Sequence, residues 1–171
     1  MSELVVVPTG TANLASVVAA FRRLGAEPTV TAEPAAIRAA GHVMLPGVGA
    51  FGAAMERLRA AGADAALRER IAADRPTMAI CVGHQLLFES SDESPGRRGL
   101  AIVAGHVGRF PDRVRVPQFG WNEVEADGDC DLLDSGYAYF ANSYRATSAP
   151  GWKLATAEHG GRFVAAMERG K

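Results

Sequence analysis

Short apolar runs alternate with helical patterns along the first half of the chain. Residues 4–7 and 42–45 are runs of this kind, and apolar residues recur at helical spacing from 14 to 24 between them. Strands buried in a parallel sheet have this apolar character, and each parallel crossover needs a long connection, usually a helix. The pattern therefore predicts strands and helices in alternation. Further strands are expected at 28–31 and 76–80, and further helices at 51–61, 64–73 and 82–90.

The second half of the chain has a different pattern. Short strand-like pieces at 105–110, 137–140, 153–157 and 162–167 are separated by turn residues, and helical periodicity is scarce. Closely spaced strands with short turns indicate antiparallel pairing. We therefore expect an α/β fold with an open, mostly parallel sheet flanked by helices, to which antiparallel strands of the C-terminal half are added. Without a repeat or a low-complexity linker, residues 1–171 are expected to form a single domain.

Composition and charge exclude several classes of function. The chain carries 18 Lys and Arg against 19 Asp and Glu, so no basic excess favours nucleic acid. No segment approaches the roughly 20 apolar residues of a membrane span, and the N-terminus lacks a signal-peptide pattern. The two cysteines, Cys81 and Cys130, lie in unlike contexts, which favours free thiols. We expect a cytoplasmic protein with neither nucleic-acid nor membrane partners.

The segment MAICVGHQLLFES contains the first candidate for chemistry. Cys81 ends an apolar run, a helical pattern follows it, and the small residues Ala79 and Gly83 stand two positions away on either side. A nucleophile on a sharp strand-to-helix turn needs small neighbours of this kind. The helix N-terminus would favour the thiolate, and the N–H of Val82 would point at a developing oxyanion. A buried structural cysteine is the alternative, whereas the acidic neighbours of Cys130 would raise its pKa.

The PGVG segment at residues 46–49 is the second candidate. It follows a predicted strand and so lies at the carboxyl edge of the sheet, where open α/β sheets bind ligands. Gly47 and Gly49 would let the backbone N–H groups around Val48 turn toward a ligand. Taken alone, such a segment is more often an ordinary strand-to-helix loop.

Five segments together carry a resemblance to a known family: LPGVGAFGAAM, AICVGHQLLFES, VPQFGWN, YFANSY and GGRFVAAMERG. They resemble the class I glutamine amidotransferases, and within that class the glutaminase subunits of imidazole glycerol phosphate synthase. The resemblance runs from Leu4 to Lys171. The C-x-G-x-Q element at 81–85 is shared by many amidotransferases. The combination of PGVG, GWN at 120–122 and YFANSY indicates this one kind of subunit.

The resemblance implies a reaction and a set of site residues. Cys81 would attack the side-chain carboxamide of glutamine, ammonia would leave, and water would hydrolyse the thioester, without a metal or another cofactor. The oxyanion would be held by the backbone of Val82, Gly47, Val48 and Gly49. Substrate glutamine would be contacted by Gln85, Glu93, Asn142, Ser143 and Tyr144. For Glu93, a solvated loop charge is an equal alternative.

The resemblance also implies a partner. Ammonia would pass to a (β/α)-barrel cyclase subunit in a heterodimer, giving imidazole glycerol phosphate and an aminoimidazole carboxamide ribonucleotide. Asn13 and Trp121 are the candidate partner contacts. Asn13 is also the expected N-cap of the helix at 14–24. An aromatic residue in a loop is often an interface anchor, but a core tryptophan is an equal alternative for Trp121.

One part of the family pattern is missing from the sequence. The family's general base is a histidine in a His-Pro-Glu segment, which residues 1–171 do not contain. None of His42, His84, His106 and His159 is followed by a carboxylate at a spacing that suggests a replacement. We expect a domain that is incomplete at its C-terminus. The alternatives are an inactive module that binds and regulates its partner, and a glutaminase serving another synthase such as anthranilate synthase, which GWN and YFANSY disfavour.

Overall fold

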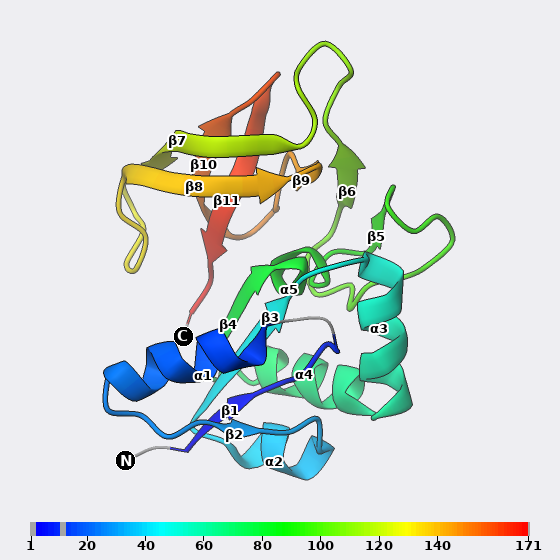
Figure 1. Cartoon of the computed structure of the whole chain (residues 1–171), viewed down its shortest axis with the longest axis vertical. Helices are drawn as coiled ribbons and strands as arrows, with labels where there is room; N and C mark the ends of the chain where they lie inside the picture. The colour runs from blue at the N-terminus through cyan, green and yellow to red at the C-terminus, as the bar shows by residue number, and fades with distance from the viewer. Residues whose placement is uncertain (1–2, 11–12, 171) are drawn as a thin grey trace.

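The computed structural model describes residues 3–10 and 13–170. Figure 1 shows a parallel sheet flanked by helices in the lower half of the molecule and antiparallel strands in the upper half. The strand order of the parallel sheet is β2-β1-β3-β4. Its strands are β1 (Leu4–Val6), β2 (Thr29–Val30), β3 (His42–Gly47) and β4 (Thr77–Cys81). The predicted α/β fold is therefore confirmed.

The helices cover this sheet and connect its strands. They are α1 (Leu14–Arg23), α2 (Pro34–Ala39), α3 (Phe51–Ala60), α4 (Ala63–Ala72) and α5 (Val82–Gln85). α1 begins as predicted, because the side chain of Asn13 accepts a hydrogen bond from the backbone N–H of Ser16 at 3.3 Å. Sequence periodicity did not predict the six-residue α2, which Pro34 starts at its first helical position. Within residues 3–10 and 13–170, no helix has the length and apolarity that crossing a membrane requires.

The helix predicted at 82–90 is wrong beyond its first turn. α5 ends at Gln85, and the chain then turns. The carbonyl oxygens of Leu86, Leu87 and Phe88, which a longer helix would use internally, accept hydrogen bonds from the returning segment at residues 100–103. Competition from this segment stops the helix, and sequence periodicity carries no signal of such a contact.

The antiparallel strands form sheets of their own and do not extend the parallel sheet, which corrects the prediction. One sheet has the order β11-β10-β7-β8, with β7 (Gln118–Ala126), β8 (Gly136–Asn142), β10 (Lys153–Glu158) and β11 (Arg162–Glu168). The other has the order β5-β6-β9, with β5 (Ser90–Ser91), β6 (His106–Arg109) and β9 (Tyr144–Ala146). Two antiparallel pairs, β7–β8 and β10–β11, satisfy their hydrogen bonds within one sheet. β4 consequently pairs with β3 alone among the described strands.

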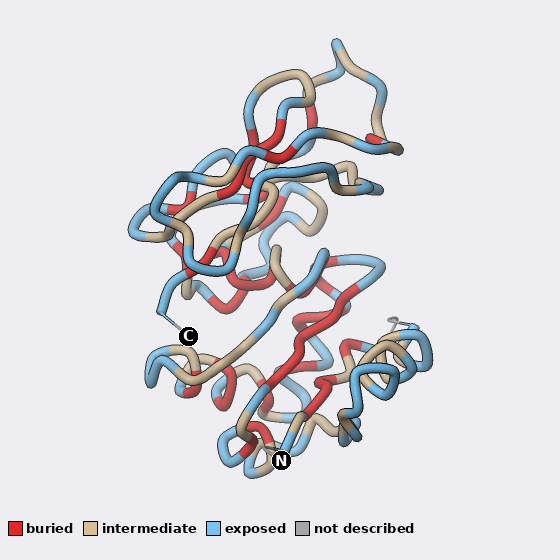
Figure 2. The backbone as a smooth tube through the Cα atoms, turned by 90° about the vertical axis from the view of Figure 1, so that its left-hand side faces the viewer, coloured by how far each residue is buried: buried red, intermediate tan, exposed pale blue. Residues whose placement is uncertain are grey.

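The apolar core is centred on the parallel sheet, where Figure 2 shows buried backbone. Val5 and Leu45 are completely buried there against α3 and α4. The same cluster includes Val107, Ala146 and Val164 from the antiparallel half. One apolar cluster thus joins the two halves and fixes the position of β9 relative to the carboxyl edge of the parallel sheet.

Candidate active site

Cys81 lies at the junction of β4 and α5 in a strained backbone conformation. Its φ of 56° and ψ of −118° fall in a region that side chains disfavour. A nucleophile elbow has such strain because the sharp turn exposes the side chain above the sheet edge. Cys81 is exposed, so it is not the buried structural cysteine that the sequence left as the alternative.

Two glycines allow the close contact between β3 and α5 on which the turn depends. Gly47 pairs with Cys81 in the β3–β4 register. A Cβ on Gly83 would lie 2.0 Å from the Leu45 carbonyl oxygen, and one on Gly47 would lie 2.5 Å from the Gly83 nitrogen. The PGVG segment therefore packs directly on the first turn of α5, beside Cys81. Val48, in the middle of the segment, is 44% exposed.

Opposing effects act on the Cys81 thiol. Loss of contact with water raises the pKa of the thiol, a hydrogen bond from the Val82 backbone lowers it, and the charge of Glu93 raises it again. The balance is a raised pKa: the Val82 N–H at the start of α5 favours the thiolate, as predicted, but desolvation outweighs it. α5 has only one turn, from Val82 to Gln85. The raised pKa favours the neutral form of the Cys81 thiol.

Glu93 is a half-buried cap and not a solvated loop charge. Its Oε2 accepts a hydrogen bond from the Phe51 backbone N–H at 2.7 Å, and Ser94 Oγ accepts one from Gly52 N–H at 2.9 Å. These contacts satisfy the first turn of α3, since Ala50 at its N-cap offers no side-chain acceptor. Glu93 is also close enough to the thiol to affect its pKa. One carboxylate thus links the α3 N-terminus to the Cys81 thiol.

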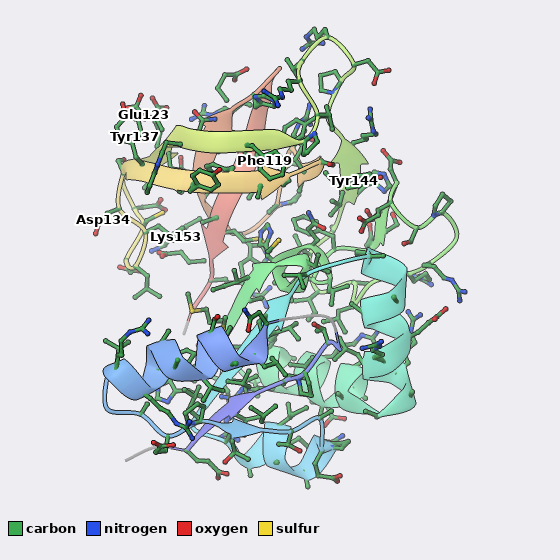
Figure 3. All side chains as sticks on the ribbon, in the orientation of Figure 1. Phe119, Glu123, Asp134, Tyr137, Tyr144 and Lys153 are labelled. Carbon is green, nitrogen blue, oxygen red and sulfur yellow. The ribbon has the colours of Figure 1, made fainter. Side chains whose placement is uncertain are left out.

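Three of the predicted substrate residues meet at a single carbonyl oxygen. Gln85 Nε2 and Asn142 Nδ2 both donate to the Tyr144 backbone oxygen, at 3.3 Å and 3.1 Å. Gln85 ends α5, Asn142 ends β8 and Tyr144 begins β9. Figure 3 labels the side chain of Tyr144. Ser143 lies between the two strands. The structure therefore brings the YFANSY segment to the helix that follows Cys81.

A cavity of about 1040 Å³ lies between the two halves of the molecule, and Cys81 and Gln85 are among the residues that line it. His84, Asn142 and Arg145 also line it, and each has a buried side-chain polar atom without a hydrogen-bond partner in the described structure. Ligand sites combine a mostly apolar lining with a few polar groups. The cavity has this combination, with the thiol at its wall.

The structure pairs none of His84, His106 and His159 with the thiol. Burial lowers the pKa of His84 to about 4, which keeps its imidazole neutral at physiological pH. His106 Nε2 lies 2.7 Å from an Asp92 carboxylate oxygen, and His159 Nε2 donates to a backbone carbonyl at 2.9 Å. The carboxylate beside His106 was not predicted, because Asp92 lies fourteen positions before the histidine and only the fold brings the two together.

Trp121 lies on β7 and is 72% exposed, so it is neither a loop residue nor a core tryptophan. Its ring meets that of Tyr139 edge-on, with the ring centroids 5.8 Å apart. Phe119 and Tyr137, labelled in Figure 3, are exposed on the same face of the β7–β8 pair. We call these four residues the aromatic face. Phe119, Tyr137 and Tyr139 were not predicted as part of a contact surface. The alternation of aromatic and polar residues in β7 could have indicated it. Asn13 is exposed at the start of α1.

The family model for class I glutamine amidotransferases matches residues 5–171. The chain belongs to this family. The imidazole glycerol phosphate synthase subunit HisH of Symbiobacterium thermophilum is 41% identical, over 99% of this chain and 82% of the relative. The HisH subunit of Methanothermobacter thermautotrophicus is 38% identical, over 96% and 84%. A crystal structure of a glutamine amidotransferase shares the fold, with a TM-score of 0.76 over 98% of this chain and 85% of that chain at 19% identity.

Proposed function

We propose that this amidotransferase is the glutaminase subunit of an imidazole glycerol phosphate synthase, which hydrolyses glutamine and delivers ammonia to a (β/α)-barrel partner. The observation that carries the proposal is the strained Cys81 elbow, packed against PGVG and one helical turn from the Gln85–Tyr144 contact. Identity of about 40% to HisH subunits supports the choice of synthase.

The reaction follows from the position of the thiol. The Cys81 sulfur attacks the carboxamide carbon of glutamine, and the carbonyl oxygen becomes an oxyanion near the backbone of Val82 and of Gly47–Gly49. The C–N bond then breaks, the leaving nitrogen takes a proton and departs as ammonia, and a thioester remains. Water hydrolyses the thioester to glutamate and restores the thiol. Because the raised pKa favours a neutral thiol, the thiol's own proton balances the one that ammonia takes, and a general base must carry it.

The remaining side chains would hold the amino-acid end of the substrate. Glu93 would meet the α-ammonium group, since its carboxylate lies beside Cys81. Asn142, Ser143 and Tyr144 would contact the α-carboxylate, and Gln85 would contact the substrate glutamine. Their convergence at the Tyr144 carbonyl is consistent with this role.

The aromatic face is the surface that we assign to the barrel partner, with Trp121 as its centre and Asn13 as an additional contact. Exposed aromatic side chains are enriched at interfaces, where they contribute much of the binding free energy. The complex would be a cytoplasmic heterodimer, and the two free thiols of Cys81 and Cys130 suit a reducing compartment.

An inactive module that binds and regulates the barrel is the second candidate. The observation that favours it is the absence of a contact between Cys81 and any of His84, His106 and His159. The two candidates differ in one respect that can be measured, namely whether glutamate is released.

Replacing Cys81 tests the proposal. In the protein expressed from its complete reading frame and assembled with the barrel partner, Cys81→Ser should reduce glutamine-dependent synthesis at least ~10³-fold. Synthesis from added ammonia should persist, because it needs only the partner. Cys130→Ser is the matched control and should leave both activities in place. Loss of both activities in Cys81→Ser would show that Cys81 is structural, and no loss would exclude a thioester.

A further inference from the structure

The loop after β5 carries Glu93 and determines where its carboxylate lies relative to Cys81. One side of this loop is fixed by α3, because Glu93 Oε2 accepts the hydrogen bond from the Phe51 N–H at 2.7 Å. The other side continues directly from β5, a strand of only two residues that pairs with β6 (Figure 1). The position of the Glu93 carboxylate therefore depends on the contacts that hold this short strand against β6.

Backbone pairing between β5 and β6 is brief. The register pairs Ser90 with His106 and Ser91 with Val107. One further hydrogen bond runs from the Asp92 N–H to the Val107 carbonyl oxygen at 3.0 Å. Two-stranded pairs are marginally stable without further contacts, and a pair of this length is shorter than most strands. Side-chain contacts are therefore needed to hold the residues that lead to the loop.

The imidazole of His106 supplies these side-chain contacts. Its Nδ1 lies 2.8 Å from Ser90 Oγ, and its Nε2 lies 2.7 Å from Asp92 Oδ1. A neutral ring with its proton on Nε2 accepts from the serine hydroxyl and donates to the carboxylate, so both nitrogens are used. The other Asp92 oxygen accepts a hydrogen bond from the Arg109 N–H at 2.9 Å, and this contact, followed by the one from His106, lowers the pKa of the Asp92 carboxyl. The ring therefore ties both ends of the segment from Ser90 to Asp92 to β6.

We propose that His106 is a positioning residue that fixes the Glu93 carboxylate relative to the Cys81 thiol. It does so by bridging Ser90 and Asp92, the residues that lead to the loop. This inference rests on the proposed function, in which Glu93 meets the α-ammonium group of glutamine. That contact is a charge-assisted hydrogen bond, which is strong only when its geometry is good. His106 thus acts on the affinity for glutamine without touching the substrate.

Two replacements of His106 separate its hydrogen bonds from the rest of the side chain. His106→Met keeps an apolar stem of similar length and removes both hydrogen bonds. His106→Gln keeps one acceptor and one donor, which can bond to Ser90 and Asp92. The protein is expressed from its complete reading frame and assembled with the barrel partner. The measured quantities are kcat and KM for glutamate release from glutamine, and the inhibition constant of 4-carbamoylbutanoate, which is glutamine without its α-amino group.

His106→Met should raise the KM for glutamine at least about fivefold and leave kcat within about twofold, because a displaced carboxylate weakens only the contact with the ammonium group. The inhibition constant of 4-carbamoylbutanoate should change less than about twofold, since this ligand has no ammonium group. His106→Gln should recover most of the affinity for glutamine.

Equal weakening of both ligands in His106→Met would show a general structural role and overturn the positioning role. An unchanged KM in His106→Met would also overturn it, as would a KM in His106→Gln as high as in His106→Met. Failure of the unaltered complex to release glutamate would instead overturn the proposed function itself, and this inference with it.

Discussion

At the scale of single residues, Cys81 and His84 have opposite environments although only two residues separate them. The strained backbone of Cys81 costs about 1–3 kcal/mol and holds the thiol exposed at the sheet edge. His84 points into the protein, where its ring packs edge-on against Phe88 and its Nε2 has no partner in the described structure. The start of α5 therefore presents the Cys81 thiol outward and buries the imidazole of His84.

The burial of His84 predicts a pH dependence of stability. Its pKa is 6.5 in the unfolded chain and about 4 in the folded protein, so only the unfolded chain binds a proton between these values. Stability is fully present above pH 6.5 and falls as the pH decreases toward 4. Urea unfolding should show that the protein loses about 2 kcal/mol more than His84→Met between pH 7 and pH 5. Equal losses of unfolding free energy in the protein and in His84→Met would show that His84 does not titrate in this way.

The residues of the site were predictable to different degrees. The small residues around Cys81 predicted the elbow, since steric contact at a sharp turn depends on local sequence. The direction of the thiol pKa shift was not predictable, because it depends on desolvation and on Glu93, twelve positions later.

At the scale of secondary-structure elements, the contact between β3 and α5 sets the geometry of the site. It positions PGVG beside Val82 and is possible only because Gly47 and Gly83 have no side chains. The α3 cap by Glu93 and Ser94 adds a second connection from this edge of the sheet to the loop after α5. The site is thus held by the close backbone contact between β3 and α5 and by the side-chain cap on α3.

Adding one methyl group at Gly83 tests the importance of the β3–α5 contact. Gly83→Ala would place a Cβ 2.0 Å from a backbone oxygen, so α5 must move away from β3. We expect a loss of roughly 1–3 kcal/mol in unfolding free energy, with glutamate release reduced at least about tenfold. Gly128→Ala is the matched control, because nothing lies within 4 Å of its added Cβ, and it should change stability by less than about 0.5 kcal/mol. Equal behaviour of the two variants would contradict the role of this contact.

At the scale of the whole molecule, the parallel half was predictable and the arrangement of the antiparallel half was not. Buried apolar runs such as those in β1 and β3 have a strong local signal. β7 was missed because Gly120 and polar residues interrupt its apolar pattern, and its pairing with β8 is a long-range property. Strand patterns also do not reveal which sheet a strand joins, which is why separate sheets were mistaken for additions to one.

The central claim is that glutamine is cleaved at Cys81 and that the released ammonia is delivered to the barrel partner. The most direct measurement follows glutamine labelled with ¹⁵N at its side-chain amide in the complex with the barrel partner, in the presence of unlabelled ammonium. The account predicts that imidazole glycerol phosphate carries the label in proportion to the glutamate released. Product that contains only unlabelled nitrogen, or a complex that releases no glutamate, would contradict it.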